Sequence, residues 1–177
     1  HHRMIREGTP LPGRSTGFDH CSIIEKATGQ PYEQALRTRI VKPLGLSATE
    51  LPDDLLPQKL AQGEHGESRG ATLVHSSIFW SAGGLVSTAH DVAVFYRALF
   101  NGDLPGGKAL IRKNGIGFGV FSDELPCGIR VWSHSGMIHG YSGVAMSSED
   151  GRRQIVIQLN SSAAGETTAI AQRLMCL

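Results

Sequence analysis

The amino-acid sequence predicts an α+β protein in which helices come first and an antiparallel β-sheet follows. Two patterns lead to this prediction. Apolar residues recur at spacings of three and four within residues 18–101, which is typical of helices, and they alternate from residue 115, which is typical of strands. Asp150-Gly151 between two late apolar runs indicates a hairpin, and a hairpin joins antiparallel neighbours.

Two helices are predicted near the start of the chain. The first covers residues 18–28 and ends at Gly29, a residue that suits the left-handed position after a helix. The second begins at Pro31, which is favoured in a first helical turn, and stops at the breaker sequence Pro43-Leu44-Gly45. Together these segments predict a helical pair.

A long irregular region and a third helix follow. Residues 47–80 are rich in proline and glycine, and a loop of this length is usually functional or mobile. Thr88 followed by Asp91 resembles a capping box, so we expect the third helix to begin there. Asn101-Gly102 marks its end.

The last third of the chain predicts a sheet and a closing helix. Alternation and turn signals predict four strands and one helix, at residues 116–120, 129–133, 143–147, 154–159 and 167–175. The helix would place its apolar face against the sheet.

Composition narrows the function classes. The chain has 177 residues and a formal net charge of +1 with histidines neutral, so it has no basic surplus that favours nucleic acid or an anionic membrane. No apolar run reaches the roughly 20 residues that a membrane span needs. The three cysteines and eight histidines lack the spacings of a structural zinc site, so neither a metal nor a cofactor is expected.

The most informative motif is His134-Ser135-Gly136, which lies between two predicted strands. Three segments precede it in order: residues 23–29 with 39–46, residues 81–88 and residues 116–120. Taken together, they resemble the serine β-lactamase and D-alanyl-D-alanine carboxypeptidase superfamily, in particular its penicillin-binding, class C-like branch. His134-Ser135-Gly136 stands where that family has Lys-Thr-Gly, His-Thr-Gly or His-Ser-Gly.

The resemblance implies a role for each residue of this motif. Ser135 would hydrogen-bond a substrate carboxylate, and His134 would supply a donor or a positive charge, so these two are the predicted catalytic residues. Gly136 would let the substrate approach the strand without a Cβ clash. The backbone N–H of Met137 would be one donor of the oxyanion hole.

We also expect a substrate cleft around the motif. His134 and Ser135 should have exposed side chains that line it at the end of a strand, and Gly117 and Gly119 should lie on the adjoining strand. Trp80, at the end of the irregular region, is predicted to bind substrate at the cleft, whereas Trp132 alternates with Val131 and is predicted to lie in the core.

The sequence departs from the family pattern in one important respect. No Ser-x-x-Lys, the motif that carries the family's nucleophile, occurs in the 177 residues, and no Tyr-x-Asn occurs either. The resemblance therefore implies the carboxy-terminal portion of one β-lactamase-like domain, truncated at the amino end. Residues 15–114 would form its mainly helical part, and residues 115–177 its sheet with the closing helix.

The resemblance implies part of a serine hydrolase that acts by acyl-serine transfer on D-Ala-D-Ala-type peptides, β-lactams or esters. Two alternatives stay open: a catalytically silent binding or structural module of the same fold, and an esterase or peptide-cyclising thioesterase-like relative. Besides a small substrate, the expected partners are a complementary chain or a second copy. The last strand would have a bare edge, and bare edges template association.

The resemblance also implies a disulfide between Cys127 and Cys176, because cysteines at these places are bridged in the Streptomyces-type DD-peptidases of the family. Such a bond would keep the end of the closing helix from fraying. Disulfides persist in oxidising compartments, so we expect an extracytoplasmic or secreted protein. Cys21 would remain a buried free thiol.

Overall fold

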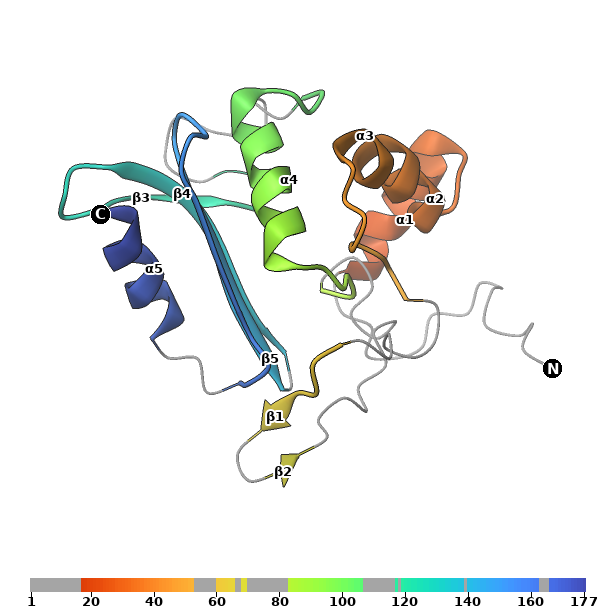
Figure 1. Ribbon diagram of the computed structural model, residues 1–177. Coiled ribbons are helices and arrows are strands. Elements are labelled where there is room, and N and C mark those ends of the chain that lie inside the picture. Colours follow the sequence, from red (N-terminus) through yellow and green to blue (C-terminus); the bar gives the residue numbers. More distant parts are fainter. Residues whose placement is uncertain are drawn as a thin grey trace.

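The computed structural model describes residues 17–52, 60–65, 68–69, 83–106, 117, 119–138, 140–162 and 166–177. Its central layer is a four-stranded sheet of order β3-β4-β5-β6 in which every neighbouring pair is antiparallel. Helix α4 covers one face of this sheet, helix α5 covers the other, and α1–α3 lie beyond α4 (Figure 1). The predicted α+β class with an antiparallel sheet is confirmed.

The helical layer consists of α1 (Gly17–Thr28), α2 (Tyr32–Leu36), a π-helical turn η1 (Arg37–Val41) and α3 (Lys42–Leu44). The first helix agrees with its predicted limits. The second helical stretch ends within the predicted breaker sequence, at Gly45, which has a left-handed φ of 66°, and Pro43 lies in its last turn. The π turn precedes the proline, and in it Lys42 N–H donates to the carbonyl of Arg37.

Helix α4 (Ala89–Asn101) begins and ends as predicted. The Thr88 side chain caps its first turn by accepting a hydrogen bond from Asp91 N–H, and Gly102 ends it with a φ of 86°. The buried Asp91 carboxylate accepts from Ala48 N–H at 2.9 Å and from the Thr49 hydroxyl at 2.8 Å. These bonds tie the segment after α3 to α4.

The sheet comprises β3 (Phe121–Glu124), β4 (Arg130–Ile138), β5 (Tyr141–Ser148) and β6 (Gln154–Leu159). Side chains of β4 alternate between two apolar clusters, one on each face. Trp132 packs with Tyr96 and Phe100 of α4, and Val131 packs with Met175 of α5 (Thr167–Met175). Trp132 is therefore a core residue, as predicted.

Two predictions about the sheet need correction. The predicted strand at 116–120 is wrong for the described residues 117, 119 and 120, because β3 begins only at Phe121. Gly119 has a φ of 79°, which an extended strand does not adopt, and Gly117 N–H donates to the Val120 carbonyl at 2.8 Å rather than to a neighbouring strand. Gly117 and Gly119 thus do not lie on the adjoining strand.

The structure also contains a small hairpin that the sequence did not predict. Its strands are β1 (Glu64–His65) and β2 (Ser68–Arg69), within the region predicted to be irregular. Glu64 also bridges to Ser161, which follows β6. Through this bridge, β1 lies beside one end of the main sheet (Figure 1).

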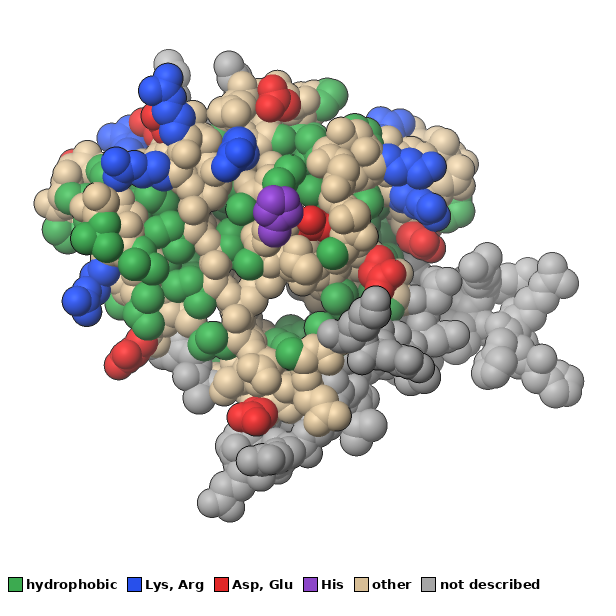
Figure 2. Space-filling model, in the orientation of Figure 1, with side chains coloured by type: hydrophobic (Ala, Val, Ile, Leu, Met, Phe, Trp, Pro, Cys, Tyr) green, Lys and Arg blue, Asp and Glu red, His purple; other side chains and the backbone are tan. Residues whose placement is uncertain are grey.

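Helix α5 presents apolar side chains outward as well as inward. Ala171 and Met175 are buried against the sheet, whereas Ile170, Leu174 and Leu177 are exposed. Apolar side chains gather over this helix in the space-filling view (Figure 2). Within the described ranges, none of the helices has the length and apolar character that crossing a membrane requires.

Candidate functional site

The predicted catalytic motif lies inside β4. His134 and Ser135 are exposed, as expected, and so are Gly136 and Met137, but all four occupy the body of the strand, whose last residue is Ile138. The expectation of a strand-end position was therefore wrong. The strand is longer than predicted because it pairs with β5 as far as Ile138 opposite Tyr141.

Among the described residues, β4 has no pairing partner on one side along the motif, and this side is here called the open edge. Strand β3 pairs with β4 only as far as Phe121 opposite Ser133. From His134 to Ile138, the described partner of β4 is β5 alone. A strand edge of this kind presents backbone N–H and C=O groups that an extended peptide can bind.

The direction of the backbone groups follows from two hydrogen bonds at the start of the strand. The Arg130 carbonyl accepts from Glu149 N–H on the β5 side, and the Ile129 carbonyl accepts from Leu125 N–H on the β3 side. Successive residues of an antiparallel strand point their backbone groups to alternate sides. Because the register with β5 is unbroken, Ser135 and Met137 point theirs toward the open edge.

The side chains of the motif alternate between the two faces of the sheet. His134 lies opposite Ala145, which belongs to the cluster under α4. Ser135 lies opposite Val144, which belongs to the cluster under α5. The imidazole and the hydroxyl therefore project to opposite faces, so they act on a bound molecule from two sides rather than forming one pair.

Gly136 faces open space. A Cβ built there meets no atom within 4 Å, apart from its chain neighbours. The structure thus leaves room over Gly136 on the α4 face of the strand, so a molecule bound along the open edge would meet no side chain at this position.

Phe121 is a site residue that the sequence analysis missed. Its ring stacks on the His134 ring, with centroids 6.2 Å apart and planes inclined by 16°. Phe121 is 55% exposed and His134 is exposed as well, so this ring contact lies at the surface of the sheet. Phe121 belongs to the alternating run of residues 116–121, but the strand predicted from that run ends at Val120, one residue before Phe121.

Trp80 and the neighbouring residues 81 and 82 lie outside the described residues. The role predicted for Trp80 therefore stays a prediction. A surface groove of about 660 Å³ lies in the helical layer between Glu33 and Pro52, and none of the predicted site residues lines it.

Another serine pattern was overlooked in the sequence. Residues 13–17, Gly-Arg-Ser-Thr-Gly, match the Gly-x-Ser-x-Gly pattern of α/β-hydrolases. In that fold the serine sits between a strand and a helix of a largely parallel sheet. All pairings within the main sheet described here are antiparallel, so the architecture does not support that reading.

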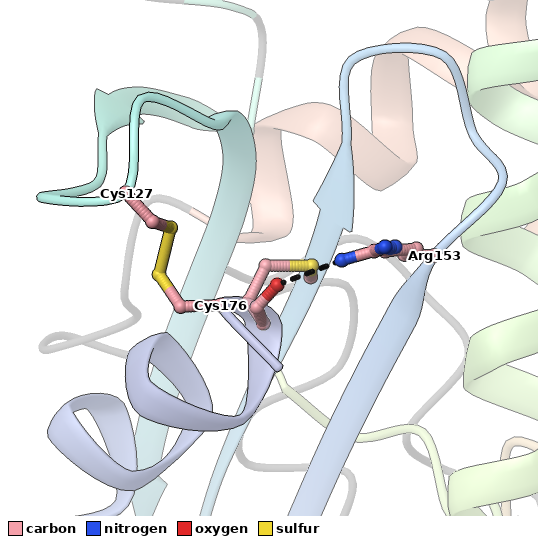
Figure 3. Close-up of a disulfide and its surroundings, with 4 residues drawn as sticks. Cys127, Arg153 and Cys176 are labelled. Atoms are coloured by element: carbon pink, nitrogen blue, oxygen red, sulfur yellow. Dashed lines mark hydrogen bonds between the residues drawn. A yellow bond between two sulfur atoms is a disulfide. The ribbon is translucent and has the colours of Figure 1, made fainter.

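The predicted disulfide is present. Cys127, in the turn before β4, is bonded to Cys176 at the end of α5, and the two Cα atoms are 5.9 Å apart (Figure 3). Arg153, just before β6, donates a hydrogen bond to the Met175 carbonyl beside this bond. The end of α5 is therefore attached to the sheet by a covalent bond and a polar contact. Cys21 is buried and takes no part in a disulfide, as expected.

Among the described residues, no group of three or more His, Cys, Asp and Glu side chains could hold a metal ion. What the site offers instead is an exposed strand edge with backbone donors and acceptors, an imidazole on one face and a hydroxyl on the other.

Comparison with known proteins agrees with this architecture. The Beta-lactamase family model matches residues 16–175, so the chain belongs to the Beta-lactamase family. It is 22% identical to a D-aminopeptidase of Cereibacter sphaeroides over 93% of its own length and 36% of that protein. The chain thus spans about a third of the length of this curated relative.

Solved structures show the same fold. A D-stereospecific amidohydrolase from Streptomyces sp. superposes with a TM-score of 0.77 at 31% identity, covering 88% of this chain and 52% of that one. A D-amino acid amidase from Ochrobactrum anthropi SV3 gives 0.77 at 23% identity, covering 96% and 58%. A penicillin binding protein from Bacillus halodurans gives 0.71 at 18% identity, covering 88% and 53%. The chain therefore spans somewhat more than half of these structures.

Proposed function

We propose that this chain forms the substrate-binding part of a serine amidohydrolase that acts on amides or short peptides of D-amino acids. Membership of the Beta-lactamase family supports the reaction class. The similarity to a D-stereospecific amidohydrolase and to a D-aminopeptidase supports the substrate class. The observation that carries the proposal is the open edge of β4 with His134, Ser135 and Met137 exposed along it.

The geometry suits an extended substrate. Such a substrate would pair with the backbone groups of Ser135 and Met137, as a peptide adds to a sheet edge. The Met137 N–H would then stabilise the oxyanion that forms when the scissile carbonyl is attacked. The His134 ring, held by Phe121, would contact the substrate on the α4 side, and the Ser135 hydroxyl would bind it on the α5 side.

The nucleophile of this reaction is proposed to come from residues other than these 177, since no Ser-x-x-Lys occurs among them. The same fact favours a second candidate, a catalytically silent binding module that uses only the open edge. D-Ala-D-Ala peptides, β-lactams and esters remain alternative ligands for either candidate.

The compartment is also a proposal. The Cys127–Cys176 bond supports an extracytoplasmic or secreted location, because such bonds persist in oxidising surroundings.

Titration with D-phenylalanine amide and its L-enantiomer, followed by amide chemical shifts in NMR, tests the proposal. We expect the D-enantiomer to shift the amides of residues 134–137 at lower concentration than the L-enantiomer. Ser135→Ala should weaken binding of D-alanyl-D-alanine, which has a carboxylate, more than binding of the amide. Ser122→Ala, a matched change on β3, should alter neither. Absence of shifts along β4 with all three compounds would refute the proposal.

A measurement of substrate hydrolysis distinguishes a catalytically active chain from a catalytically silent binding module. The 177 residues by themselves are expected to hydrolyse neither D-phenylalanine amide nor the β-lactam nitrocefin, because binding groups alone form no acyl intermediate. Hydrolysis that persists through purification and is lost in Ser135→Ala would show that these residues contain a complete catalytic site.

A further inference from the structure

A short segment of the irregular region is fixed against one end of the main sheet. Residues 61–64, here called the strap, lead into β1. Glu64 N–H donates to the Asn160 carbonyl at 2.8 Å, and the Asn160 side-chain amide donates to the Gln62 carbonyl at 2.8 Å. Ser162 N–H donates to the Glu64 carbonyl at 3.2 Å. The strap is thus bonded to the segment that follows β6, and the Gln62–Asn160 pair is 98 positions apart in the chain.

The strap also holds Tyr141, the first residue of β5. The Tyr141 hydroxyl donates to the Ala61 carbonyl at 2.7 Å. Burial raises the pKa of this hydroxyl above its ordinary value of 10.0, against a smaller lowering effect from the backbone at Gly63, so it remains a donor at neutral pH. The bond closes the strap over the turn that joins β4 to β5.

Gly63 is required here for space. A Cβ at this position would lie 2.8 Å from Tyr141 Cε2 and 2.9 Å from the Gly140 carbonyl oxygen, closer than real Cβ atoms approach. Gly63 is not among the glycines with a positive φ, so backbone conformation does not explain it. The strap therefore lies so close to the turn that any residue larger than glycine at position 63 would displace either the strap or the turn.

Two further bonds attach the same turn and the start of β5 to the segment after β6. Gly140 N–H donates to the Ser162 hydroxyl at 3.2 Å, and the Ser142 hydroxyl donates to the Ser161 carbonyl at 2.6 Å. The turn and the first residues of β5 are consequently bonded both to the strap and to the segment after β6.

This end of the hairpin carries the last residues of the open edge. Tyr141 lies opposite Ile138, and Ser142 lies opposite Met137. Adjacent strands of a ladder move together, so a displacement of Tyr141 changes the position of Met137. We propose that Gly63 and Tyr141 are positioning residues that, through the strap, set where the Met137 N–H points at the open edge. The positioning is a structural claim, and only its catalytic meaning rests on the proposed function.

Hydrogen exchange of backbone amides in the 177-residue chain tests this proposal. The amides of Gly136 and Ile138 point toward β5, as does that of Trp132 near the other end of β4. Tyr141→Phe removes the bond to Ala61 and should accelerate exchange at Ile138 and Gly136 roughly fivefold, the effect of one lost hydrogen bond, while Trp132 stays unchanged. Gly63→Ala should accelerate it further. Tyr32→Phe, the same change in the helical layer, should leave all three amides unchanged.

Two exchange results would overturn the proposal: unchanged exchange at Ile138, or equal acceleration at Ile138 and Trp132, which indicates general destabilisation. A second readout is the dissociation constant for D-phenylalanine amide, which should rise several-fold in Tyr141→Phe at an unchanged urea midpoint. If the unaltered chain does not bind this amide and Ile138 still exchanges faster in the variant, the proposed function fails and the positioning role stands. If the chain binds the amide equally well with and without the Tyr141 hydroxyl, the positioning role fails alone.

Discussion

Removal of the Cys127–Cys176 bond is expected to lower the free energy of unfolding by about 4 kcal/mol. The two cysteines are 49 residues apart, and the chain-entropy relation gives about 4 kcal/mol for a loop of that length at 25 °C. The effect arises mainly because the unfolded chain gains freedom. In the folded state, α5 still buries Ala171 and Met175 against the sheet.

Urea unfolding of the double variant Cys127→Ala/Cys176→Ala measures the change. With a typical slope of about 2 kcal/mol per molar urea for a small protein, the midpoint should fall by roughly 2 M. Arg153→Gln, which removes only the bond to the Met175 carbonyl, should shift the midpoint much less.

Reducing agent provides the internal control. It should lower the midpoint of the unaltered protein to that of the double variant and leave the variant itself unchanged. The reasoning is refuted if the two proteins unfold at the same urea concentration without reductant. It is also refuted if Cys127 is alkylated in the native protein without reductant, since no bond would then exist.

Three further predictions concern stability and association. Asp91→Ala should lower the free energy of unfolding in urea by about 2–4 kcal/mol, because it leaves the Ala48 N–H and the Thr49 hydroxyl without their acceptor. Asp91→Asn should lower it less, and an equal loss in the two variants would contradict this account. Burial raises the pKa of Tyr96 to about 12. The contribution of the neutral Tyr96 side chain to the free energy of unfolding should therefore be complete below about pH 10 and be lost as the pH rises toward 12. Tyr96→Phe should flatten that decline in urea midpoints, and an equally steep decline would exclude Tyr96 as its cause. The exposed apolar residues of α5 and the edge of β6 predict self-association, which light scattering would report as a mass above the monomer value of 19.0 kDa. Leu174→Glu should reduce this association, and a monodisperse monomer would contradict the prediction.

Local signals in the sequence determined several elements correctly. Thr88 with Asp91 marked the start of α4, and Asp150-Gly151 marked the β5–β6 turn, where Gly151 has a φ of 68°. The alternation of 154–159 matched β6, and the apolar spacing of 167–175 matched α5. These features depend on contacts between residues close in the chain, so the order of residue types was sufficient to predict them.

The site was predicted only in part, because its geometry depends on strand pairing between segments that are far apart in the sequence. The motif His134-Ser135-Gly136 and its exposure were anticipated, and the disulfide followed from the family resemblance. The placement of β3 failed because glycines alternating with apolar residues look like a strand, while Gly119 in fact turns the chain. Whether a segment pairs depends on a partner that lies elsewhere in the sequence.

The sequence by itself therefore determined the class of the fold, most of its helices and the first residues of the strand whose continuation carries the motif. Only the tertiary structure decided that β3 stops opposite Ser133 and leaves the following edge of β4 open. It also decided that the His134 and Ser135 side chains project to opposite faces, and that Gly63 touches Tyr141 across 78 residues of chain. Register and close contact are set by packing between distant segments, and no local pattern of residues encodes that packing.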